Sequence, residues 1–130
     1  MRIPRSRLAV DALMWIGLLA APVAWAGQHI AGVWVQIARC HDRAAGASPG
    51  LPVDAVTIAV GAAAAALALI GLVAAVASWW TTRSADDDDP PPSGRIHFMG
   101  VVGMTISPLF LAMIVMSSAG GIAIMECVQS

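Results

Sequence analysis

The chain has 130 residues, of which 58% are hydrophobic and only 12% are charged, and its formal net charge is −1. A typical soluble domain carries about 25% charged residues, so this composition excludes an ordinary soluble globular protein. The balanced charge also gives no sign of a nucleic-acid partner. We expect one all-α membrane domain that covers residues 1–130.

Three long apolar segments occupy residues 12–38, 55–80 and 98–125. A helix needs about 20 apolar residues to cross a hydrocarbon core of about 30 Å, so the sequence predicts three transmembrane helices. The basic start and the Ala24-Trp25-Ala26 step also resemble a cleavable signal peptide. Because the apolar stretch continues through Ile37, we expect a membrane span instead.

All seven basic residues are Arg, and five of them fall on one predicted side of the membrane. Three precede the first segment and two flank the second loop, whereas only Arg39 and Arg43 lie in the first loop. The positive-inside rule therefore predicts a cytoplasmic N-terminus and a periplasmic C-terminus. The predicted location is the bacterial inner membrane, crossed several times.

Polar and aromatic side chains follow one face of the first segment. Polar groups inside a bilayer usually face protein rather than lipid, so this polar-aromatic stripe predicts an interface with a partner protein. The alternative is that the stripe makes contacts within the bundle. Haem ligation by His29 is a further alternative, although the other two segments offer no second His at matching depth. The predicted interface residues are Trp15, Pro22, Trp25, Gln28, His29 and Gln36.

The two cysteines, Cys40 and Cys127, come just after the first and third segments and so share the outer side of the membrane in this topology. An oxidising compartment favours a disulfide between them. Two free thiols are the alternative. We expect the disulfide to clamp the first span to the third.

The second segment is built from small residues. We expect Gly61 and Ala65 to carry close helix contacts, and Asp54 to form the N-cap. Trp79 and Trp80 close the segment where interfacial rings prefer to lie, and they are candidates to border a bound lipid or quinone.

The segment 81–95 contains four consecutive Asp residues and then three Pro residues. Like charges and proline favour an extended, solvated linker, which we predict on the cytoplasmic side. A docking site for a basic partner loop is the alternative.

The third segment contains Pro108, which predicts a kink. Gly103 and Ser107 are expected at close helix contacts. Met113 and Met116 are three residues apart and offer thioethers that suit Cu(I), although Met is also ordinary apolar filler. The sequence contains no nucleophile–base constellation, phosphate loop or nucleotide fingerprint, so we expect no catalysis.

Two stretches resemble a small three-helix bacterial membrane-protein family that is often encoded with cytochrome c oxidase genes. The first runs Ala-Pro-Val-Ala-Trp-Ala-Gly-Gln over residues 21–28, followed by Gly32 and Cys40. The second is Phe-Met-Gly at 98–100, followed by Gly103, Ser107, Leu109-Phe110 and Cys127. The resemblance covers about half of the chain.

This resemblance implies a non-catalytic accessory subunit of a membrane respiratory complex. The complex is expected to be a haem–copper terminal oxidase or its supercomplex, with haem and copper held by the partner subunits and none by this chain. One alternative is an assembly factor that inserts copper or haem through His29, Met113, Met116 or the cysteines. Another is a small transport helper, although Asp11 and Glu126 fall only at segment ends and proton-coupled transport usually needs a deeper carboxylate.

Overall fold

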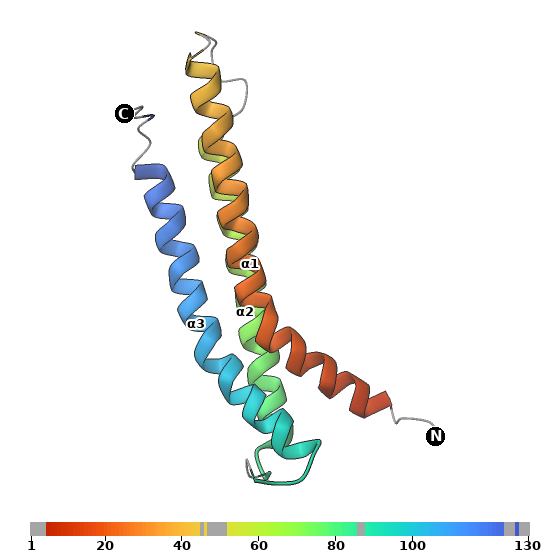
Figure 1. Ribbon diagram of the computed structural model, residues 1–130. Coiled ribbons are helices and arrows are strands. Elements are labelled where there is room, and N and C mark those ends of the chain that lie inside the picture. The colour runs from red at the N-terminus through yellow and green to blue at the C-terminus, as the bar shows by residue number, and fades with distance from the viewer. Residues whose placement is uncertain (1–4, 45, 47–51, 86–87, 124–126, 128–130) are drawn as a thin grey trace.

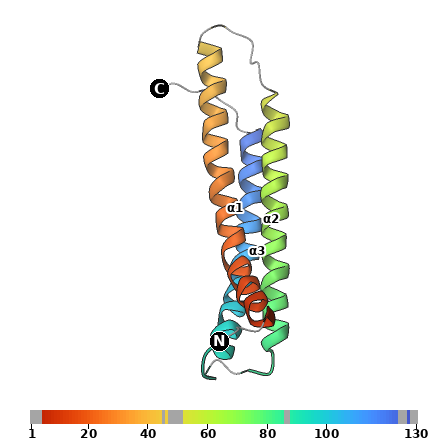
Figure 2. The same ribbon diagram turned by 90° about the vertical axis from the view of Figure 1, so that its right-hand side faces the viewer.

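A computed structural model describes residues 5–44, 46, 52–85, 88–123 and 127. These residues form three helices, α1 (Arg5–Ala44), α2 (Val53–Thr82) and α3 (Ser93–Ala123). The chain passes up, down and up again, so α1 begins and α3 ends at opposite ends of the bundle (Figures 1 and 2). Each helix includes a stretch long and apolar enough to cross a membrane: Leu8–Asp42, Val53–Thr82 and Ser93–Ile122.

The helices are longer than the predicted spans, which corrects three boundaries. Residues 39–44 continue α1 instead of starting a loop, because Arg, Asp and Ala are acceptable helix residues and no Gly intervenes before Gly46. Asp54 lies in the first turn of α2 and Pro52 occupies the N-cap position, with no side-chain cap. The connection between α2 and α3 is residues 83–92 rather than 81–95.

Small side chains fill the interior, and large apolar ones cover the outside. The core cluster consists mainly of alanines, and Ile114 is its one large buried member. By contrast, Val23 is 65% exposed, Val73 67% and Leu109 65%. A soluble protein would bury such residues and leave small or polar ones outside. This reversed pattern fits helices that pack through small residues in a lipid environment.

The first helix bends sharply, and its N-terminal part leans away from α2 and α3 (Figure 1). Pro22 lies inside α1, where it lacks the N–H that would pair with the carbonyl of Leu18 and its ring crowds the preceding turn. The side chain of Ser107 on α3 donates to the carbonyl oxygen of Gly17 at 3.4 Å. A neighbouring hydroxyl thus supports the backbone beside the bend, as membrane helices with proline require.

The sequence predicts a kink at Pro108, and the sharper bend in Figure 1 is in α1, the helix that contains Pro22. The third helix continues through Pro108 and curves along its length (Figure 1). Pro108 is exposed on the bundle surface, whereas Pro22 is half-buried. The direction of a bend depends on this packing, which the proline alone does not specify.

Candidate functional site

The polar-aromatic stripe of α1 divides between the inside and the outside of the bundle. Gln28 is buried, whereas Trp15, His29 and Gln36 are exposed. The remaining two members, Pro22 and Trp25, are half-buried. The structure therefore leaves the outer members free for a partner and uses the inner ones for the fold.

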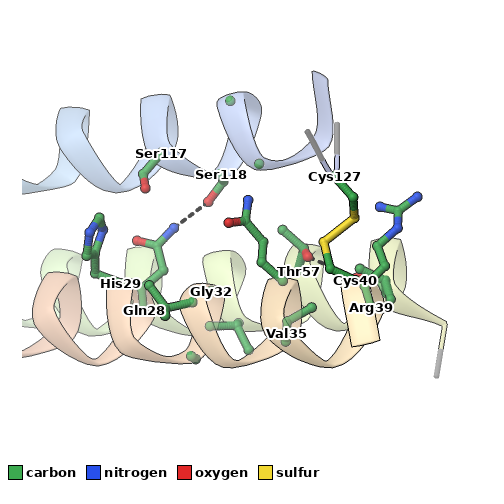
Figure 3. Close-up of a pocket in the computed structure, with 17 residues that line it drawn as sticks. Gln28, His29, Gly32, Val35, Arg39, Cys40, Thr57, Ser117, Ser118 and Cys127 are labelled. Atoms are coloured by element: carbon green, nitrogen blue, oxygen red, sulfur yellow. Dashed lines mark hydrogen bonds between the residues drawn. A yellow bond between two sulfur atoms is a disulfide. The ribbon is translucent and has the colours of Figure 1, made fainter. Parts of the chain in front are cut away.

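Gln28 links α1 to α3 through its amide nitrogen. This nitrogen donates to the carbonyl oxygen of Ile114 at 3.1 Å and to the hydroxyl oxygen of Ser118 at 2.7 Å. The Ser118 hydroxyl in turn donates to the same Ile114 carbonyl at 2.9 Å. Figure 3 shows Gln28 and Ser118 facing each other between the helices. This connection is polar and buried, so it sets the register of α1 against α3.

Trp25 joins the core to the exposed side of α1. Its ring stacks on His29 with centroids 5.5 Å apart and meets Phe110 of α3 at 5.7 Å. Trp25 also packs against the alanine-rich core cluster. The indole thus holds the exposed His29 ring in place while it contributes to packing.

The residues expected at close helix contacts lie inside the bundle. Gly61 is buried, and a Cβ there would collide with the Ser118 side chain. Ala65 packs on the core cluster. A Cβ on Gly103 would lie 2.9 Å from both Ala75 Cβ and the Gly17 carbonyl oxygen, and Ser107 is 1% exposed.

The closest approach of a described glycine to the backbone of another helix was not anticipated from the sequence. A Cβ on Gly17 would lie only 2.7 Å from the backbone Cα and N of Ala75. Gly103 approaches the same point from α3, so all three helices meet there. Small residues such as Gly17 and Ala75 indicate where helices can approach closely. Predicting that these two residues meet requires the relative positions of the helices, which the sequence does not give.

A disulfide joins Cys40 of α1 to Cys127, which follows α3, with Cα atoms 5.8 Å apart and a sequence separation of 87. The expected covalent link between the first and third helices is therefore present. Because both sulfurs are bonded to each other, neither supplies a thiolate for copper or haem.

A pocket of about 250 Å³ lies beside the disulfide, where the three helices diverge. Figure 3 shows Gln28 and His29 at one end and Arg39 with the disulfide at the other. Val53 and Thr57 of α2 and Ser117 and Ser118 of α3 complete parts of the wall. The sequence did not indicate this pocket, because it forms between segments far apart in the chain.

The opposite end of the bundle carries the two interfacial tryptophans. Trp80 is exposed, and its ring meets the Trp79 ring edge-on with centroids 5.5 Å apart. The Arg83 guanidinium lies over the Trp80 ring, 5.1 Å from its centroid. Trp79 packs beside Gly100 of α3. This end therefore presents an aromatic and cationic rim suited to a membrane surface.

Among the described residues, no group of three His, Cys, Asp or Glu side chains is arranged to hold a metal ion. Met113 and Met116 are both exposed. The hydroxyls of Ser107, Thr105 and Ser118 donate to backbone carbonyls, which is a packing role. Comparison with protein-family models, with curated proteins and with solved structures gave no match.

Proposed function

We propose that the chain is a non-catalytic accessory subunit of a larger complex in the bacterial inner membrane, with its N-terminus in the cytoplasm and its C-terminus in the periplasm. The three apolar helices and their reversed packing support a three-span protein. The Arg distribution favours this orientation.

The disulfide is an independent argument for the same orientation. Cys40 and Cys127 lie at the end of the bundle opposite to Arg83, Arg95 and the acidic connection. Disulfides persist in the periplasm and are rare in the cytoplasm. The charge rule and the redox rule therefore assign the two ends in the same way.

The observation that carries the proposed role is the exposure of polar groups in the middle of an apolar helix. His29 and Gln36 are exposed on one face of α1 and are separated by two helical turns, with Val33 between them. Polar side chains facing hydrocarbon are costly and are normally covered by protein. His29, Val33 and Gln36 also border the pocket beside the disulfide. We infer that a partner helix covers the outer side of this face, which we call the His29–Gln36 face.

The resemblance of residues 21–40 and 98–127 to the family encoded with cytochrome c oxidase genes supports a more specific partner. We propose that the complex is a haem–copper terminal oxidase or its supercomplex, which would hold the haem and copper. The chain itself would contribute contacts and stability, with lipid filling the remaining surface.

One observation favours a second candidate, a copper- or haem-insertion assembly factor. Met113 and Met116 are exposed and lie on adjacent turns of α3, where two thioethers can approach one Cu(I) ion. Copper bound to the isolated protein in equimolar amount would favour this candidate over the accessory subunit.

Photo-crosslinking in native membranes tests the partner face. A photoreactive residue replaces Val33 on the His29–Gln36 face, and the matched control replaces Val73, which is 67% exposed on α2. We expect one discrete protein adduct from position 33 and mainly lipid adducts from position 73. Equal or absent protein adducts at both positions would contradict the assigned face.

A further inference from the structure

The pocket beside the disulfide contains buried polar atoms that the fold leaves without partners. The Nη1 atom of Arg39 and the Oε1 atom of Gln28 are both buried and form no hydrogen bond with the described chain. Both residues line the pocket. Leaving a buried donor without an acceptor costs more free energy when the donor belongs to a cation than when it is neutral. A bound acceptor at Arg39 would therefore be the more stabilising of the two.

The charges around this pocket favour an anion. Among the lining residues that the structure describes, Arg39 carries the one full charge. The N-terminus of α2 forms part of the wall at Val53 and has no side-chain cap, so its free N–H groups add positive potential. The nearby described carboxylates, Asp42 and Asp54, form no ion pair with Arg39 in the described part of the chain.

The rest of the described wall combines polar side chains, those of Gln36, Thr57, Ser117 and Ser118, with an apolar part. Gly32 and Val35 of α1, Val60 of α2 and Gly120 and Gly121 of α3 lie along it. The volume of about 250 Å³ corresponds to roughly eight water-sized groups of about 30 Å³ each. A headgroup with a short piece of chain fits such a space, while a whole lipid does not.

We propose that this pocket binds the headgroup of an anionic glycerophospholipid of the phosphatidylglycerol class. The phosphate oxygens accept from the Arg39 guanidinium, whose fork matches phosphate geometry. The glycerol hydroxyls hydrogen-bond with Gln36, which lines the pocket about one turn before Arg39, directly or through a bridging water. The acyl chains leave the pocket between the helices and continue in the bilayer.

Gln28 and Arg39 lie at opposite ends of the pocket (Figure 3) and are eleven residues apart on α1, which is about 16 Å along a straight helix. A phosphoglycerol headgroup is shorter than this, so it occupies the Arg39 end beside the disulfide. Basic pockets between transmembrane helices are known to take anionic lipid headgroups. This inference does not depend on which complex the chain joins.

Native mass spectrometry of the delipidated full chain in detergent tests the proposal. The probes are phosphatidylglycerol, phosphatidylcholine and inorganic phosphate. We expect phosphatidylglycerol to bind more tightly than phosphatidylcholine and to resist competition by excess inorganic phosphate. Arg39→Gln should weaken phosphatidylglycerol binding roughly tenfold or more, since it removes charge-assisted hydrogen bonds.

The matched control is Arg83→Gln, which removes an exposed cation at the other end of the bundle. It should leave the pocket's affinity unchanged. Equal loss in the Arg39 and Arg83 variants, with the disulfide intact in both, would overturn the site. Displacement by inorganic phosphate at comparable concentration would overturn the lipid assignment.

Discussion

Replacing Gly17 with Ala should destabilise the bundle, because it adds one methyl group at the point where the three helices meet. The new Cβ would lie 2.7 Å from Ala75 Cα and N, whereas carbon atoms in contact prefer about 3.5–4.0 Å. Both neighbours are backbone atoms, so no side chain can rotate away. The helices must therefore separate by about 1 Å at this crossing.

The expected loss follows from two contributions. Overpacking of a tight contact costs about 1–3 kcal/mol. Separation of the helices also weakens the bond from Ser107 to the Gly17 carbonyl, and such bonds in membrane proteins average about 0.6 kcal/mol. We expect the free energy of unfolding to fall by about 1.5–3.5 kcal/mol in total.

The assay is unfolding of the purified chain in mild-detergent micelles with increasing sodium dodecyl sulfate, followed by tryptophan fluorescence and circular dichroism. Gly27→Ala is the matched control, because a Cβ on Gly27 of the same helix meets nothing within 4 Å. Its stability should be unchanged or rise by up to about 1 kcal/mol through helix propensity. Equal stabilities of the two variants would refute the close approach of α1 and α2 at Gly17.

Two other variants test the links between α1 and α3. The double variant Cys40→Ser with Cys127→Ser removes a disulfide with a sequence separation of 87, and loop-closure entropy sets an upper bound of about 4–5 kcal/mol on its contribution to stability. Because membrane-bound helices already restrict the unfolded chain, we expect a smaller loss of stability in the same unfolding assay. No loss of stability would contradict the clamp. Ser118→Ala removes the hydroxyl that accepts a hydrogen bond from Gln28 at 2.7 Å, and it should lower the free energy of unfolding by about 0.6–1.7 kcal/mol. The control Ser117→Ala changes an exposed neighbour and should leave the stability unchanged.

The three-helix architecture follows from sequence because hydrophobic length is a local property. Segments of more than 20 apolar residues separated by Gly, Pro and Asp predict helices without knowledge of any contact. The disulfide was predictable for a similar reason, since topology places both cysteines on one side. Helix ends were less predictable: α1 continues through Arg39 and Cys40, because polar residues continue a helix as readily as they end it.

The site required the relative rotation of the helices, which the sequence does not contain. Gln28 and His29 are neighbours in the chain, yet one is buried against α3 and the other is exposed. The polar-aromatic stripe identified a face of α1 but did not show which of its residues are buried and which are exposed. The pocket combines Arg39 with side chains from α2 and α3, and the bend in α1 changes which faces meet.

The most direct test of the central claim, that the chain is an accessory subunit of a respiratory complex, is affinity purification of the tagged protein from its native membranes in mild detergent. Quantitative proteomics and a visible absorption spectrum of the eluate give the readout. We predict terminal-oxidase subunits in near-equal amounts, together with haem absorption bands. A colourless eluate that contains the chain without oxidase subunits would contradict the proposed function.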